Sequence, residues 1–420
     1  MQINTTNHIT TIKTGKFKTT LIKVSFKAEL ARETVTRRIL LANVLRNSSK
    51  KFGSKKLLNA HLEDLYGASL SVNAKKLGKL HTIRFYMQVA NEKFLKSAPP
   101  LFDATLKTLG EVVLNPKIAD NSFDKSIVNL EARLLKEDIE SIYDDKTTYA
   151  LQKMVATMCE DENFAINGAG YIDDLAHIDE KTLVTTYESM LNNDDVSIVI
   201  LGDVAHNDVM QLFDANFNLK SVVRTKLSAV DKEEKDMRSV TIVEEEQAVN
   251  QTKLNIGYRT GTRITDEDYF ALLVMNGVFG AFAHSKLFVN VREKESLCYY
   301  CSSQLDNFKG LMYVYSGLDV AQIPKAIEII DKQLNDVCCG NFSEDELLLA
   351  KKSIINAKRE SLDSSSGMLS DLEMGQVLGL SADEFVKKVE NVTATDISRI
   401  AKKVKKDTVF TLKPSKEMSQ

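Results

Sequence analysis

The sequence of 420 residues lacks any apolar run that approaches the roughly 18 residues a membrane-spanning helix needs. Its first residues, MQINTTNHITTIKTG, also lack the apolar segment of a secretory signal peptide. Neither sign of charge is in excess, because 55 Lys and Arg stand against 58 Asp and Glu and give a net charge of −3. A balanced charge gives no general attraction to nucleic acid or to an anionic membrane. We therefore expect a cytoplasmic protein with neither kind of partner.

Cysteine is scarce, with 5 residues that form no spaced framework. This usage is typical of free thiols in a reducing compartment and argues against a disulfide-stapled secreted fold. Cys298 and Cys301 form a C-x-x-C pair, but the surrounding residues are typical of a strand. Positions three apart in a regular strand point to opposite faces. The sequence therefore predicts that this pair is neither a redox couple nor a metal chelate.

Proline is also rare, with 5 residues, while hydrophobic residues make up 43% and charged residues 27% of the chain. This balance is typical of a folded, helix-rich α/β protein and excludes a disordered or fibrous chain. The length exceeds one ordinary core and fits two domains of roughly 150 to 200 residues each.

The order of elements in the first half of the chain returns in the second half. Apolar periodicity predicts strands at 20–28, 69–74, 80–89 and 196–201, with helices at 38–46, 56–66, 100–113 and 120–142. From residue 250 it predicts strands at 253–258, 298–304, 311–318 and 408–412, with helices at 266–278, 285–291, 324–337 and 344–360. Ser343 with Glu346, and Ser381 with Glu384, fit capping boxes at helix starts. The repeated order indicates an internal duplication.

The boundary between the two copies is predicted in a segment rich in Lys, Glu and Asp. We expect domains at 1–220 and 247–420, joined by a charged linker at 221–246. Adjacent pairs of strands with helices between them favour an α+β fold class, in which each domain is a mostly antiparallel sheet covered by helices on one face. The acidic residues 244–246 are expected at an exposed strand edge, where charge discourages unwanted pairing.

One segment, SKLFVNVREKESLCYY at 285–300, is more specific than the rest. It starts as a helix with Leu287, Phe288 and Val291 on one face, and it turns into a strand within 292–296. This segment resembles the pitrilysin/insulinase family of inverted-motif zinc peptidases, which includes the mitochondrial processing peptidases. The resemblance covers nearly the whole chain in element order, and the preceding NGVFGAFAHSKLF is similar to a Gly-containing turn of the family.

The resemblance assigns roles to Arg292 and Tyr299, which match an Arg at a helix end and a Tyr seven residues later in a pattern like R-x-K-E-x-L-G-Y. A guanidinium and a phenol can hold a scissile peptide and the oxyanion that develops on it. Cys298 stands where the family usually has Gly, which is expected to perturb the backbone mildly. In isolation the two residues would be interpreted as a solvated helix-end arginine and a core tyrosine.

The zinc half of the family's site is missing. Members that hydrolyse peptides carry H-x-x-E-H, with two His ligands and a Glu general base, and this sequence contains no such motif. The register of KKFGS at 50–54 places the motif on ILLAN at 39–43, so that Ile39, Ala42 and Asn43 occupy the ligand and base positions. The distal carboxylate has two candidates, Glu131 and Asp138.

The 6 His residues offer no substitute for the missing motif. His61 and Glu63 lie two apart on a predicted helix and so point in different directions. The others are isolated and are interpreted as structural or surface groups: His8, His81, His177, His206 and His284.

The resemblance therefore implies the non-metal subunit of a heterodimeric zinc peptidase, inactive alone and binding no cofactor itself. A homologous partner with H-x-x-E-H would supply Zn, and Arg292 and Tyr299 would act on a peptide or unfolded polypeptide. The alternative is a non-catalytic scaffold or structural core subunit of a larger assembly. A homodimer with an unusual metal site is a third possibility.

Overall fold

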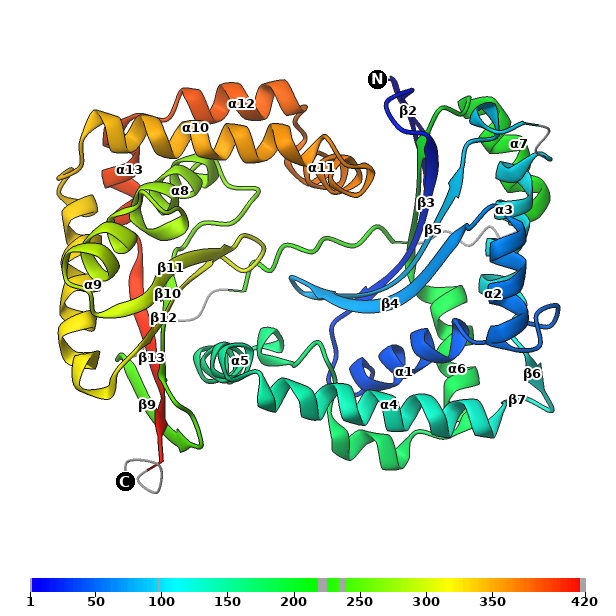
Figure 1. Cartoon of the computed structure of the whole chain (residues 1–420), viewed down its shortest axis with the longest axis horizontal. Coiled ribbons are helices and arrows are strands. Elements are labelled where there is room, and N and C mark those ends of the chain that lie inside the picture. The colour runs from blue at the N-terminus through cyan, green and yellow to red at the C-terminus, as the bar shows by residue number, and fades with distance from the viewer. Residues whose placement is uncertain (1, 97–98, 218–224, 234–238, 416–420) are drawn as a thin grey trace. The chain divides into compact units, whose positions relative to one another are not determined.

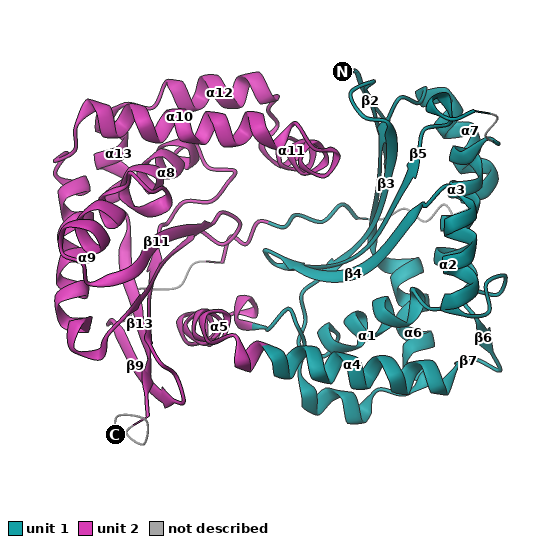
Figure 2. Ribbon diagram, viewed as in Figure 1, with its two compact units in different colours: residues 1–141, 166–229 teal, residues 142–165, 230–420 magenta. Residues whose placement is uncertain are grey.

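The structure is a computed structural model that describes residues 2–96, 99–217, 225–233 and 239–415. It divides into two compact units, shown in different colours in Figure 2. Unit 1 comprises residues 1–141 and 166–229, and unit 2 comprises 142–165 and 230–420. The units thus differ from the contiguous domains expected at 1–220 and 247–420, because a segment of the first half packs with the second.

The segment expected to be a linker, 221–246, is only partly described. Residues 221–224 and 234–238 lie outside the described residues. The acidic part belongs to strand β9 (Thr241–Gln247), which is an edge strand of the sheet of unit 2. The strand edge expected at residues 244–246 is therefore confirmed, while the chain enters unit 2 already at Val230.

The sheet of unit 1 has six strands in the order β1-β2-β8-β3-β5-β4. Only β2 and β8 are parallel, and all other neighbours are antiparallel. The bounds are β1 (Gln2–Thr6), β2 (Ile9–Lys13), β3 (Thr19–Glu29), β4 (Ser69–Leu77), β5 (Leu80–Ala90) and β8 (Asp195–Gly202). A separate hairpin pairs β6 (Ile118–Ala119) with β7 (Ser122–Phe123).

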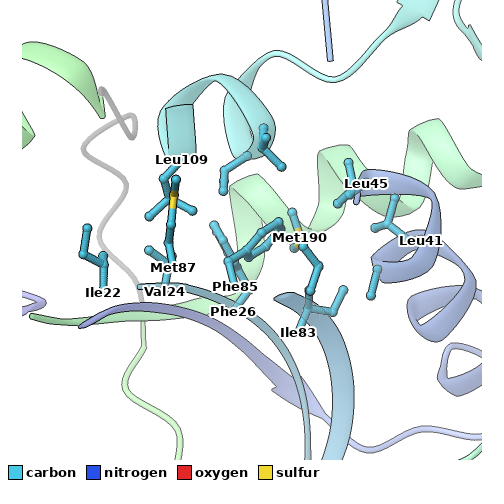
Figure 3. Packing of buried hydrophobic residues seen from close by; sticks show 14 of the residues in the cluster. Ile22, Val24, Phe26, Leu41, Leu45, Ile83, Phe85, Met87, Leu109 and Met190 are labelled. Carbon is cyan, nitrogen blue, oxygen red and sulfur yellow. The ribbon is translucent and has the colours of Figure 1, made fainter. Parts of the chain in front are cut away.

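Helices of unit 1 cover one face of this sheet (Figure 1). Along β3, Ile22, Val24 and Phe26 alternate with more polar neighbours and join the apolar cluster beneath the helices. Figure 3 shows them packed with Leu41 and residues of the neighbouring elements. The helices are α1 (Val35–Leu45), α2 (Lys55–Asp64), α3 (Leu101–Leu114), α4 (Lys125–Asp144), which runs across the division between the units, α6 (Glu180–Asn193) and α7 (His206–Asn216). Short 3₁₀ turns lie at Glu92–Phe94 and Ile172–His177.

The sheet of unit 2 repeats the arrangement of unit 1. Its order is β11-β12-β10-β13-β9, in which β13 and β9 are parallel and the other neighbours antiparallel. This matches β4-β5-β3-β8-β2 of unit 1 in both order and direction. The bounds are β10 (Thr252–Arg259), β11 (Cys298–Asp306), β12 (Leu311–Leu318) and β13 (Lys405–Pro414). The predicted α+β class with two mostly antiparallel, helix-covered sheets is confirmed.

Helices of unit 2 pack on one face of its sheet, over an apolar cluster that includes Ile256 and Val314. The capping boxes predicted at Ser343 and Ser381 are both present, and Thr393 with Asp396 forms another. The helices are α8 (Tyr269–Asn276), α9 (Ile323–Cys338), α10 (Glu344–Ser361), α11 (Ser365–Leu378), α12 (Ala382–Glu390) and α13 (Ala394–Ala401). Within the described residues, no helix is long and apolar enough to cross a bilayer.

The opposite face of this sheet is covered by α5 (Lys146–Met158), which comes from the first half of the chain. Met154 and Met158 pack here with Tyr313 and Phe410. A Cβ at Gly257 would lie 2.7 Å from the sulfur of Met158 and 3.2 Å from that of Met154. Glycine therefore lets the helix lie directly on β10. A 3₁₀ turn at Asn163–Ala165 follows α5, and another lies at Val320–Gln322.

Buried ion pairs fix the end of this returning segment. Glu162 has no exposed side-chain surface, and its oxygens contact Arg259 at 2.7 Å and Lys309 at 2.5 Å. Asp407 lies 2.7 Å from Arg259, and Asp231 lies 2.9 Å from Lys309. Burial alone would raise the pKa of Glu162, but hydrogen bonds from the two cations hold it below its ordinary value. Three carboxylates thus share two cations in a site with little water.

We predict that Glu162→Gln lowers the free energy of unfolding of unit 2 by about 3 kcal/mol at pH 7. Removing one partner of a buried ion pair leaves the other charge desolvated and incompletely paired, which costs about 3 to 5 kcal/mol. Urea unfolding of the full chain, followed by circular dichroism, would measure the loss. The matched control is Glu160→Gln, two residues earlier and exposed, which should change stability by less than about 0.5 kcal/mol.

The stabilisation by Glu162 should also depend on pH. Its pKa is lower in the folded than in the unfolded chain, so its contribution is complete above the unfolded pKa and is lost as the pH falls below about 4. The difference between wild type and Glu162→Gln should therefore shrink as the pH falls from about 5 through the ordinary glutamate pKa of about 4.3 and on towards the lower folded pKa. A difference that stayed constant over this range would contradict a charged Glu162.

Candidate functional site

The segment singled out by its sequence begins with an irregular stretch of helix. After α8 the chain forms a π-helical turn, η4 (Gly277–Ala281). The next helix also contains a π-helical stretch, η5 (Phe288–Lys294). A Cβ at Gly280 would lie 2.4 Å from the hydroxyl of Ser303 and 2.7 Å from Leu287, so only glycine permits this contact with β11. Glycine at this position thus lets the π-helical turn lie directly on β11. Such turns are often found at functional sites.

A tight turn joins η5 to β11, within the range predicted from the sequence. Val291 and Leu297 on either side of it are buried, and the amide of Leu297 donates a hydrogen bond to the carbonyl of Val291 at 3.1 Å. Between them Ser296 adopts φ = +50°, a left-handed conformation that is uncommon for a residue with a Cβ. Cys298 has no positive φ, so the residue that replaces the family's glycine brings no left-handed strain.

Tyr299 is the extra residue of a β-bulge at the start of β11. Cys298 pairs with Leu318 and Tyr300 pairs with Gly317, so Tyr299 is an extra residue on β11 between two pairs whose partners are adjacent on β12. The bulge turns Tyr299 outward, and 77% of its surface is exposed. This exposure contradicts the interpretation of Tyr299 as a core-packed tyrosine.

Arg292 lies in the last turn of η5, also exposed. Its guanidinium carbon sits 4.5 Å from the centroid of the Phe288 ring, which supports the side chain from one side. Among the described residues, neither Arg292 nor Tyr299 has a hydrogen-bond or ion-pair partner. The nearby carboxylate of Glu295 pairs with Lys325 at 2.5 Å. Two strong donors therefore stand at one helix-to-strand turn, free to bind an external acceptor.

The bulge overturns the expectation that the two cysteines of the C-x-x-C pair point to opposite faces of the strand. Both Cys298 and Cys301 pack against the helix-covered core of unit 2, because the extra residue shifts Cys298 onto the face of Cys301. The Cys301 thiol donates a hydrogen bond to the Cys298 sulfur, which with the charge of Arg292 lowers the pKa of Cys298 to about 7. The same hydrogen bond and burial raise the pKa of Cys301. Strict alternation, assumed from the sequence, fails at this point.

The positions predicted for the degenerate zinc motif form part of the apolar core of unit 1. Ile39 and Ala42 belong to the cluster between α1 and the sheet, and Asn43 is buried beside them. The carbonyl of Asn43 accepts a hydrogen bond from the Asn47 amide at 2.7 Å. These side chains offer no imidazole or thiolate, so they do not fit a zinc ion.

The two candidates for the distal carboxylate, Glu131 and Asp138, do not have the surroundings of metal ligands. Glu131 of α4 is 1% exposed, and its two oxygens contact Arg46 and Asn47 of the α1 end, each at 2.9 Å. Asp138, the other candidate, is exposed. The Glu131 oxygens, which a metal ion would require as ligands, instead accept hydrogen bonds from the Arg46 guanidinium and the Asn47 amide. Over the ranges that the structure describes, no cluster of three or more His, Cys, Asp or Glu could hold a metal ion.

The histidines have structural surroundings. His61 contacts the hydroxyl of Thr108 at 2.9 Å and stacks on Phe52, and Glu63 does not share this contact. His81 is buried in β5, and burial together with the nearby charge of Arg38 lowers its pKa to about 3. Neither is arranged as a metal ligand.

We predict that Glu131→Gln destabilises unit 1 by about 2 kcal/mol. The change removes a charge-assisted pair and leaves Arg46, which is partly exposed, to be solvated by water, so the loss is smaller than for a fully buried pair. Thermal or urea unfolding of the full chain would measure it.

Asp138→Asn is the matched control, because Asp138 lies on the same helix and is exposed. It should leave stability within about 0.5 kcal/mol of wild type. Equal effects of the two changes would contradict an anchoring role for Glu131.

Comparisons with known proteins identify the family of this chain. A family model described as "Peptidase M16 inactive domain" matches residues 177–354. The chain is 37% identical over 410 residues to "Probable inactive metalloprotease YmfF" of Bacillus subtilis, covering 97% of this chain and 95% of that one. It is 23% identical over 309 residues to "Uncharacterized zinc protease YmxG" of the same organism, with 70% and 71% of the two chains covered.

A solved structure has the same fold. The crystal structure of a conserved protein from Enterococcus faecalis matches with a TM-score of 0.90 and 31% identity, over 97% of this chain and 96% of that one. With a relative of such identity along nearly its whole length, the chain belongs to the peptidase M16 family, the pitrilysin/insulinase peptidases, as an inactive-type member without H-x-x-E-H.

Proposed function

We propose that this chain is the non-metal subunit of a heterodimeric zinc peptidase, in which Arg292 and Tyr299 bind the substrate and stabilise its transition state. The partner is a homologous chain with H-x-x-E-H that supplies the zinc and the general base. The substrate is a peptide or an unfolded polypeptide. The observation that carries the proposal is the exposed Arg292–Tyr299 pair, which has no partner among the described residues.

The local structure supports a binding role over a purely structural one. A tyrosine that served packing would be buried, yet the bulge presents Tyr299 to solvent. Left-handed Ser296 and the π turns are irregularities of a kind that gathers at functional sites. Since Arg292 carries a permanent charge and five N–H donors, it can hold a peptide carbonyl while the Tyr299 hydroxyl donates to the developing oxyanion.

The structure of unit 1 supports the proposal that the metal and the general base belong to the partner subunit. The zinc-motif positions and Glu131 are occupied by core packing and by an ion pair, so the metal and base must come from elsewhere. A relative named as a zinc protease exists in the organism that has the 37% identical relative, which is the kind of pair that the proposal requires.

We predict that Arg292→Ala and Tyr299→Phe each lower the turnover of the assembled peptidase about tenfold or more. Each change removes a donor to the oxyanion, worth about 3 kcal/mol in comparable sites. The partner is first isolated by pull-down with the native full-length chain. Hydrolysis of an unstructured peptide by the complex is then measured under saturating substrate.

Two neighbouring changes serve as controls. Tyr300→Phe alters the next residue of the strand, whose ring packs near that of Tyr315, and Lys294→Ala removes a cation of the same helical turn. Both should retain near wild-type turnover. Wild-type turnover in both site variants would exclude the catalytic role.

The alternative, a non-catalytic scaffold or structural core subunit, predicts a different result when the native chain is purified. A chain that purifies alone as a stable homodimer, or with a partner that contains no stoichiometric zinc on metal analysis, would favour it over the peptidase subunit.

A further inference from the structure

Two cysteines lie together at the start of β11, on a single face of the strand. Cys301 is 1% exposed and belongs to the apolar cluster under the helices, while Cys298 is half-buried against the same cluster. The bulge at Tyr299 creates this arrangement by changing which face Cys298 occupies. Each thiol interacts with the other.

We propose that Cys298 and Cys301 form a dithiol modification site that reacts with hydroperoxides and closes to a disulfide. The proposal rests on the register of β11 and the unequal burial of the two thiols. It does not require Arg292 or Tyr299 to act on a peptide, so it stands apart from the proposed peptidase role.

The environment gives the two thiols different roles. Cys298 is accessible, receives a hydrogen bond from Cys301 and lies near the charge of Arg292, all of which stabilise its thiolate, the reactive form of cysteine. Cys301 is shielded from solvent and keeps its proton, as a resolving thiol must until a partner sulfur is oxidised. A low-pKa cysteine that is at least partly accessible to solvent and lies next to a second thiol is the arrangement found in reversible thiol oxidation, and the half-buried Cys298 fits it.

The reaction is balanced in two steps. The Cys298 thiolate attacks the terminal oxygen of the hydroperoxide ROOH, the O–O bond breaks, and after protonation the products are Cys298 sulfenic acid and the alcohol ROH. The Cys301 sulfur then attacks the Cys298 sulfur and expels hydroxide, which takes the Cys301 proton and leaves as water. The hydroperoxide gains two electrons, and the two thiols lose them.

The remaining cysteines provide an internal comparison. Cys338 and Cys339 are adjacent at the end of α9, where burial raises the pKa of Cys338 and Cys339 is exposed. Cys159 is buried under α5. If exposure alone decided reactivity, Cys339 would react first.

The test uses the reduced full-length chain, treated with hydrogen peroxide at pH 7 and quenched by unfolding in N-ethylmaleimide. Chymotrypsin cleaves after Tyr299 and Tyr300, so a disulfide between Cys298 and Cys301 appears by mass spectrometry as two peptides joined together. We expect this product to form at least about tenfold faster than oxidation of Cys339, since about half of Cys298 is thiolate at pH 7 against a few per cent for an ordinary cysteine.

Variants separate the two steps. In Cys301→Ser, peroxide should leave Cys298 as a sulfenic acid that dimedone traps, whereas wild type should yield little dimedone adduct. Cys298→Ser should abolish rapid oxidation at Cys301. The control Cys338→Ser/Cys339→Ser should form the disulfide at the wild-type rate.

Two results would overturn the proposal: oxidation of Cys339 before Cys298 in wild type, or rapid oxidation of Cys298 that stops at sulfenic acid although Cys301 is intact. Both are read from the wild-type chain, so they hold even where a serine variant does not fold. Peptidase activity is not part of the readout, so failure here leaves the proposed function untouched.

Discussion

The ion pairs around Glu162 are the constraint on which unit 2 depends. Arg259 and Lys309 project from the second half of the chain, and Glu162 arrives from the first half behind α5. Without that carboxylate, two cations with little exposed surface would lose a shared counter-charge, and α5 would lose its anchor on the sheet. The helix covers the sheet face opposite α8, so the strand framework that carries β11 is held from both sides.

Within this sheet, the β-bulge at the start of β11 determines which side chains are exposed at the candidate site. The bulge at Tyr299 exposes the phenol and, by the same shift of register, brings Cys298 to the face of Cys301. The π-helical turn η5 before it carries Arg292 and ends at Lys294, two residues before the left-handed Ser296. The Tyr299 phenol, the Arg292 guanidinium and the Cys298 thiol thus share one helix-to-strand turn.

The first unit shows how an equivalent fold accommodates the absence of a metal. Its sheet has the strand order of the second unit, yet Ile39 and Ala42 are packed into its core and Glu131 is bound by Arg46 and Asn47. Apolar packing and an ion pair satisfy the interior in place of metal ligation. The residues at these positions therefore offer no zinc ligands, which is consistent with an inactive-type member of the M16 family.

The sequence by itself determined the α+β class, the repeated order of elements, the two capping boxes and the Arg292–Tyr299 turn. Each of these is encoded locally, by apolar periodicity, cap residues or a contiguous motif. Only the tertiary structure decided that residues 142–165 belong to unit 2, that Glu131 pairs with Arg46, and that Cys298 lies beside Cys301. These features depend on pairings between distant segments and on a bulge that breaks the period of two, and neither leaves a local signal in the sequence.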